Sequence, residues 1–216
     1  MSERIYVGVD IAGASDTWAT ALTPNANGLE IVFGPKLTPL TFLTEFATEN
    51  EVVAVAIDAP LTAALTDETG FRSSDRELRE LLPADCRDWV ASANSLMAVP
   101  SRGRLLADAL APLVGTLLET HPRACLLLHL GEDSKSDVKG YKGKAPNKEC
   151  LSILVRRWTE DFGIHGGVAA GSDGALDALV CATVSYCFHS RPDHLRRLRH
   201  DAAAVTGRGP FYVVVR

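Results

Sequence analysis

The sequence predicts an α/β fold in which a mixed central sheet is flanked by helices. Two observations carry this prediction. Three strand-like segments follow one another near the N-terminus, which is typical of a β-meander. The next apolar segment is almost uninterrupted, as expected for a central strand covered on both faces. These four segments span residues 5–9, 17–23, 29–33 and 52–57.

Short turns separate the first three strands. The segment I-Y-V-G-V ends at Asp10, and the small residues I-A-G-A-S follow it. The segment T-W-A-T-A-L-T alternates, and P-N-A-N-G leads into L-E-I-V-F. Thr38, with Pro39 in the first helical position, then predicts a helix with apolar residues at 40, 43 and 46.

The middle of the chain is more helical. Ser74 and Glu77 match a capping box ahead of an apolar helix face. We expect a helical and loop insertion around residues 72–112, with one helix continuing over 105–114. A short strand at 116–119 and a helix at 122–130, with Pro at its start and Gly after its end, follow.

The last third alternates between polar and apolar segments. Residues 132–146 are rich in Lys and Gly and predict a mobile loop. Asn147 caps a helix that reaches Phe162, and an apolar helix covers 173–189. Residues 195–200 suggest a short basic helix, and 211–215 a closing strand. We expect a single domain over residues 1–216.

Composition narrows the class of protein. The chain has 216 residues, of which 46% are hydrophobic and 23% charged, so it can bury a full core. It shows neither signal-peptide anatomy nor an apolar run long enough for a membrane span. Its five cysteines are scattered without a C-x-x-C pair, which favours buried free thiols in the cytoplasm and argues against zinc.

A net charge of −5 opposes a strongly basic, non-specific nucleic-acid binder. Local clusters of basic side chains nevertheless keep a nucleic-acid or nucleotide substrate open. The clusters consist of Arg72, Arg76, Arg79 and Arg87, and of Lys135, Lys139, Lys142, Lys144 and Lys148.

Acidic side chains end several apolar segments. Asp10, Asp58 and Glu119 each follow a predicted strand, and a further pair opens the apolar helix near the C-terminus. If the strands are adjacent and parallel, their acids emerge at one end of the sheet, where α/β proteins bind ligands. Converging carboxylates repel one another unless they share a hard divalent cation such as Mg²⁺ or Mn²⁺. The predicted metal ligands are Asp10, Asp58, Glu119, Asp173 and Asp177.

Each acid also has an ordinary structural explanation. Asp10 and Asp58 could form turns, and Glu119 could pair with a neighbouring basic residue. Asp173 could cap the helix that follows it. Asp177 is harder to explain, because it interrupts the apolar segment A-L-D-A-L-V-C-A.

Six short motifs, in this order, resemble a known family: G8-V-D-I-A-G, I57-D-A-P-L, R72-S-S-D-R-E-L-R, E119-T-H-P, the Lys/Gly segment and L176-D-A-L-V-C-A. The chain resembles the predicted nucleases of the domain-of-unknown-function family 429, within the ribonuclease H-like superfamily. The resemblance implies three antiparallel strands followed by parallel strands, with helices on both faces. It also implies catalytic metal binding by Asp10, Asp58 and Asp177, with Glu119 as an added ligand or a base.

Three further residues are candidates for substrate binding. Arg76 could reach a phosphate or pair with Glu80, and His121 could carry a proton or cap the next helix. Lys142 resembles part of the family's Lys-rich substrate loop, although it could simply be solvated. The neighbouring Tyr141 could stack on a base.

Three functions therefore remain in competition. The first is a metal-dependent phosphodiester hydrolase, a nuclease with one or two divalent ions. The second is a phosphotransferase or ATPase of the actin-like fold, which also begins with an acid-ended strand followed by glycine. The third is a non-catalytic protein that retains the fold. No membrane partner is expected, and the sequence does not predict the oligomeric state.

Overall fold

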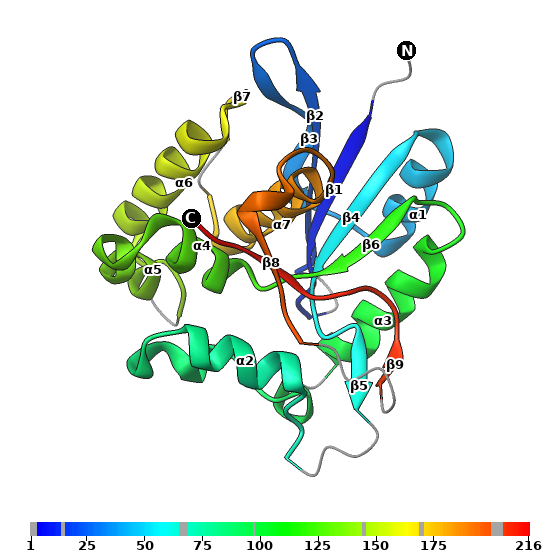
Figure 1. Ribbon diagram of the computed structural model, residues 1–216. Helices are drawn as coiled ribbons and strands as arrows, with labels where there is room; N and C mark the ends of the chain where they lie inside the picture. The colour runs from blue at the N-terminus through cyan, green and yellow to red at the C-terminus, as the bar shows by residue number, and fades with distance from the viewer. Residues whose placement is uncertain are drawn as a thin grey trace.

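A computed structural model describes residues 4–13, 16–64, 69–96, 98–143, 146–168, 171–199 and 205–216. Its centre is a six-stranded sheet in the order β6-β4-β1-β2-β3-β7 (Figure 1). The strands are β1 (Ile5–Asp10), β2 (Trp18–Asn25), β3 (Gly28–Leu37), β4 (Val52–Asp58), β6 (Thr116–Glu119) and β7 (Ile164–His165).

Strand directions confirm the mixed sheet. β1, β2 and β3 pair antiparallel as a meander, whereas β4 pairs parallel with β1 and β6 pairs parallel with β4. β7 adds a short parallel pair at the far edge of β3. Because β1, β4 and β6 run in one direction, their C-terminal ends lie together at one edge of the sheet.

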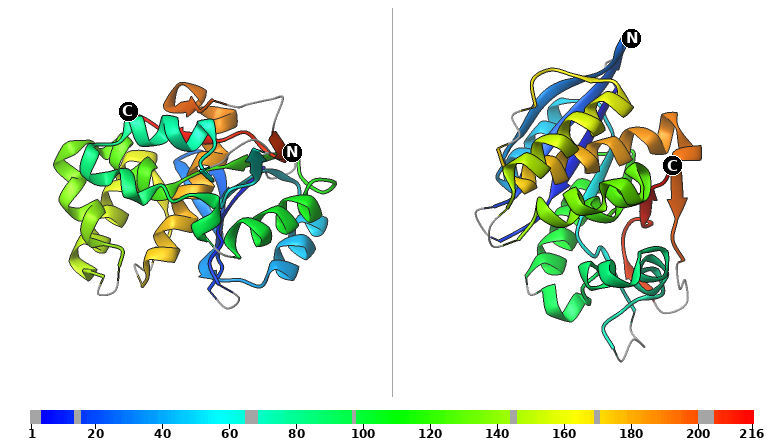
Figure 2. Two further views of the ribbon diagram at one scale, coloured as in Figure 1. Left: turned by 90° about the horizontal axis from the view of Figure 1, so that it is seen from below. Right: turned by 90° about the vertical axis from the view of Figure 1, so that its left-hand side faces the viewer.

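Helices flank the sheet on both sides (Figures 1 and 2). On one face α7 (Asp173–Ser190) packs against β1, β2 and β4, with α4 (Pro122–Leu130) and α6 (Lys148–Phe162) beside it. On the other face lie α1 (Leu40–Glu49) and α3 (Val99–Leu110). None of the helices in the described part of the chain combines the length and the apolar character that a membrane span requires.

The alternation of side chains along β1 explains the two cores. Val7 and Val9 point into the core shared with α1 and α3. Gly8 lies between them and faces α7, where an added Cβ would lie 2.0 Å from the backbone nitrogen of Ala182. Only glycine permits this approach, so Gly8 sets how closely α7 lies against β1.

Between β4 and α3 the chain leaves the sheet. β5 (Thr62–Ala64) pairs with β9 (Val205–Gly207), and α2 (Ser73–Leu81), η1 (Ala84–Trp89) and η2 (Ala93–Leu96) follow β5 in sequence. The predicted capping box of Ser74 and Glu77 is wrong. Arg72 occupies the N-cap position of α2, and its backbone N–H donates to the carboxylate of Asp75.

The predicted basic helix at 195–200 is also wrong. Residues Leu195–Arg197 form β8, which pairs antiparallel with β10 (Tyr212–Val214), so a partner distant in sequence overrides the local pattern. His200 lies outside the described residues.

The segment predicted as a loop over 132–146 contains η3 (Glu132–Ser134) and α5 (Lys135–Gly140). Its polar composition concealed the helix, because burial of Val138 and Tyr141 stabilises it. Residues 144 and 145 lie outside the described residues. The helix expected over 105–114 begins earlier and ends at Leu110.

Candidate metal centre

Three of the predicted acids meet at the C-terminal edge of the sheet. Asp10 ends β1, Asp58 ends β4, and the two residues are paired in the parallel register of these strands. Asp177 reaches them from the second turn of α7. Each of the three contributes a carboxylate oxygen to a group in which all oxygens lie within 4.8 Å of one another.

Small residues make this convergence possible. Gly174 lies one turn before Asp177, and a Cβ there would lie 2.4 Å from the Trp18 ring and 3.0 Å from Oδ2 of Asp10. Together with Gly8, this glycine lets the start of α7 approach the ends of β1 and β2. Both glycines are visible in the sequence, but their role could not be predicted from it. That role depends on which helix packs against which strand.

Asp177 is completely buried and both of its oxygens have partners. The Tyr141 hydroxyl donates to Oδ1 at 2.8 Å, and the Lys142 ammonium forms an ion pair with Oδ2. The expectation that Tyr141 stacks on a base is wrong, because its side chain is buried against the protein core. Tyr141 is therefore a functional candidate that sequence reasoning placed in the wrong role.

Burial is the largest cause of the pKa shifts of Asp10 and Asp58. It raises the pKa of Asp10 well above its ordinary value, and repulsion from Asp177 and Asp58 raises it further. Burial also raises the pKa of Asp58, although Lys142 and His121 oppose the effect. For Lys142, burial lowers the pKa, but attraction to Asp177, Tyr141, Asp58 and Asp10 together outweighs burial, and the net shift is upward.

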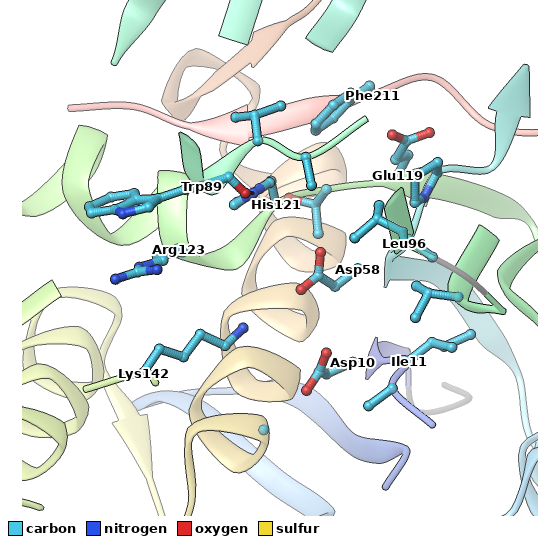
Figure 3. A pocket seen from close by; sticks show the side chains of 18 of the residues that line it. Asp10, Ile11, Asp58, Trp89, Leu96, Glu119, His121, Arg123, Lys142 and Phe211 are labelled. Atoms are coloured by element: carbon cyan, nitrogen blue, oxygen red, sulfur yellow. Dashed lines mark hydrogen bonds between the residues drawn. The ribbon is translucent and has the colours of Figure 1, made fainter. Parts of the chain in front are cut away.

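Asp10 and Asp58 line a cavity of about 390 Å³ (Figure 3). Figure 3 shows Asp10 and Asp58 at its base, Lys142 extending toward them, and Trp89, His121 and Phe211 along its wall. The cavity therefore combines a strongly acidic base with aromatic surfaces. Its other lining residues include Ile11, Trp18, Leu96, Val99, Arg123 and Asp173.

His121 lines the cavity and holds the start of α4. Its Nδ1 accepts a hydrogen bond from the Ala124 N–H at 3.2 Å, so Nε2 carries the ring proton. Nε2 lies 3.2 Å from the carbonyl oxygen of Trp89 and donates to it. Both ring nitrogens are thus engaged by the backbone.

Glu119 does not join the three aspartates. It is in register with Ile57, one residue before Asp58, and side chains alternate along a strand, so Glu119 points away from the aspartates although it lines the same cavity. Its carboxylate instead accepts two hydrogen bonds from Arg72, at 2.5 and 2.8 Å, and one from the Leu61 N–H at 2.9 Å. Sequence reasoning did not pair Arg72 with Glu119 because 47 positions separate the two residues.

Two other predicted residues lie outside the aspartate group. Asp173 lines the cavity at the first residue of α7, while Ser172, not Asp173, accepts the capping hydrogen bond. Arg76 is exposed on α2, donates to the Thr69 hydroxyl at 3.0 Å, and is not among the residues that line the cavity.

Comparison with known proteins identifies the family of this chain. A model of a family described as "Protein of unknown function (DUF429)" matches residues 8–202. The chain belongs to the DUF429 family. No curated protein and no solved structure matches it significantly. The match spans all three aspartates of the centre and the lysine beside them.

Proposed function

We propose that this DUF429 protein is a metal-dependent phosphodiester hydrolase of the nuclease type that uses Mg²⁺ or Mn²⁺. The observation that carries the proposal is the convergence of Asp10, Asp58 and Asp177 within 4.8 Å, where Asp10 and Asp58 line a cavity and Asp177 is buried beside them. Three converging carboxylates, one of them completely buried, are costly without a cation, and hard oxygen donors suit these two ions. The donor set therefore fits the proposed metal.

The strand order supports the nuclease assignment. Three antiparallel strands are followed by parallel strands on the β1 side, which is the arrangement that a ribonuclease H-like fold requires. In this arrangement the first strand, the fourth strand and a late helix supply the acids. The same stations are occupied here by Asp10, Asp58 and Asp177.

In this proposal the three aspartates hold the divalent ion, which would activate a water molecule and stabilise charge on the leaving oxygen. Other residues of the protein would bind the substrate and exclude water. Lys142 presents an ammonium to the cavity and attracts a phosphate. The aromatic wall at Trp89 and Phe211 can exclude water and contact an apolar part of the substrate.

Glu119 and His121 act as positioning residues in this proposal. Glu119 accepts the Leu61 N–H and so holds the segment that directly follows Asp58. His121 has both nitrogens engaged, so it holds α4 and the Trp89 carbonyl rather than transferring a proton. Asp173 adds negative potential near Asp10 without joining the ligand group.

Thermal unfolding with and without Mn²⁺ tests the proposal. An ion present at about 100 times its Kd stabilises the native state by about 2.7 kcal/mol, which corresponds to a shift of about 5–10 °C for a chain of this size. We expect this shift in the native protein and its loss in Asp10→Asn and Asp177→Asn. Asp108→Asn is the control, because Asp108 is an exposed acid paired with Arg208.

A cleavage panel completes the test. Single- and double-stranded DNA and RNA are incubated with Mn²⁺ and the native protein, and we expect cleavage that Asp10→Asn abolishes. Stabilisation by ATP without cleavage of any nucleic acid would favour the phosphotransferase instead. Absence of any response to divalent ions would favour the non-catalytic alternative.

A further inference from the structure

Lys142 is held in the acidic centre by its surroundings. It directly follows Tyr141, whose ring is fully buried, and α5 before it packs against α6. Arg123, on α4, stabilises the same segment, because its guanidinium donates hydrogen bonds to the carbonyl oxygens of Val138 and Lys139. The backbone at Lys142 is therefore anchored from several sides.

Lys142 also differs from the lysines of the adjoining helix. Lys135 and Lys139 both pair with Asp85, away from the cavity. Lys142 instead points into the cavity and pairs with the completely buried Asp177 (Figure 3). Its side chain is only 29% exposed, and its charge also acts on Asp10 and Asp58.

Charge balance then limits how many metal ions the centre can hold. Its three aspartates carry three negative charges, while Glu119 pairs outside this group with Arg72, which it shares with Asp75. One divalent ion and one ammonium bring three positive charges to the aspartates. A second divalent ion would leave a partly buried centre with excess positive charge, which is costly in a medium of low dielectric constant.

The contacts of Asp177 point in the same direction. Its Oδ1 accepts from Tyr141 and its Oδ2 is paired with Lys142, so each oxygen keeps a lone pair for a single ion, while the ammonium already lies beside Oδ2, where a second bridged ion would need to be. Asp10 and Asp58, adjacent in register at the ends of β1 and β4, remain directed toward the cavity (Figure 3).

We infer that Lys142 supplies the second positive charge of the centre, so that each chain takes one divalent ion and the Lys142 ammonium contacts the phosphoryl oxygens of the substrate. This inference rests on the proposed function. It replaces the open choice between one and two metals with a single ion, and it gives the lysine a defined role.

Metal stoichiometry tests the inference without relying on activity. Isothermal titration with Mn²⁺, supported by native mass spectrometry, should show one ion per native chain. Lys142→Met removes one positive charge beside the ion, so we expect at least about tenfold tighter binding of the first ion and a measurable second ion. Lys142→Arg keeps the charge and should retain one ion per chain.

Lys139→Met is the matched control, because Lys139 lies three residues earlier and pairs with Asp85. It should leave stoichiometry and affinity unchanged. Two ions on the native chain, or equal affinity and stoichiometry in Lys142→Met and native protein, would overturn the inference while leaving the proposed function intact. Failure of the native chain to bind Mn²⁺ at all would overturn both.

Discussion

Two buried clusters of charge lie near the ends of neighbouring strands, and they differ in how completely their charges are matched. In the first, Arg72 donates to Glu119, to Asp75 and to Thr62. In the second, three aspartates face a single ammonium, that of Lys142. In the first cluster one guanidinium hydrogen-bonds both carboxylates, so the protein alone satisfies them. In the second, three carboxylates share one ammonium, which leaves the larger excess of negative charge.

This difference separates structural acids from candidate ligands. Glu119 and Asp177 are almost equally buried, and both end up beside a basic side chain. Burial alone therefore does not distinguish them. The number and geometry of their partners does, because Glu119 accepts three hydrogen bonds, two of them from one guanidinium, whereas Asp177 accepts one hydrogen bond and one ion pair and keeps capacity for a cation.

The largest effect on stability should follow from breaking the first cluster, that of Arg72, Glu119 and Asp75. Arg72→Met leaves Glu119 and Asp75 buried without their partner, so the free energy of unfolding should fall by about 3–5 kcal/mol. Urea denaturation measures it. Arg208→Met, which removes an exposed pair, should cost no more than about 1 kcal/mol. Equal losses in the two variants would contradict the structural role of Arg72.

A second variant should disrupt the cluster of three aspartates and leave the cluster around Arg72 intact. Gly8→Ala places a Cβ 2.0 Å from the Ala182 nitrogen, so α7 must shift and carry Asp177 away from β1. We expect a loss of about 3 kcal/mol of stability together with the loss of stabilisation by Mn²⁺. Gly167→Ala is the control, because its Cβ would meet no atom within 4 Å. Full retention of the Mn²⁺ effect in Gly8→Ala would show that the approach of α7 is unimportant for the centre.

Neutralising one acid in each cluster should give effects of opposite sign. Asp10→Asn relieves repulsion in the metal-free protein and should raise its Tm by about 2–4 °C, the change that about 1 kcal/mol produces in a chain of this size. Glu119→Gln should lower the Tm, because it weakens the pairing with Arg72. Scanning calorimetry in the presence of a chelator measures both, and a lower Tm for Asp10→Asn would be the contrary result.

The smallest expected effect is a dependence on pH. Burial raises the pKa of Asp10 and Asp58 in the folded protein above the ordinary value of 3.8, so the native state binds more protons than the unfolded state. Their contribution to stability is present below that value and is lost as the pH rises through the raised pKa values. The Tm advantage of Asp10→Asn over native protein, both metal-free, should therefore grow with pH in this range and vanish below it. An advantage that is constant with pH would contradict the raised pKa of Asp10.

Much of the sheet could be predicted because its strands carry their own signal. The meander and β4 have apolar patterns that burial on one or both faces requires, and Asn147 and Gly163 mark the ends of α6. β8 and α5 could not be predicted in this way. β8 depends on pairing with β10, and α5 depends on burial of Val138 and Tyr141, so both owe their structure to distant partners.

The candidate site also combines features that local sequence predicts with features that depend on distant partners. Sequence alone determined that Asp10 and Asp58 end apolar strands and that Asp177 interrupts an apolar helix, because burial is encoded in local patterns. Only the tertiary structure decided that these three acids meet and that Glu119 pairs with Arg72. It also decided that Lys142 and Tyr141 contact Asp177. The physical reason is that the direction of a side chain depends on strand register and helix packing, which are set by residues far apart in the chain.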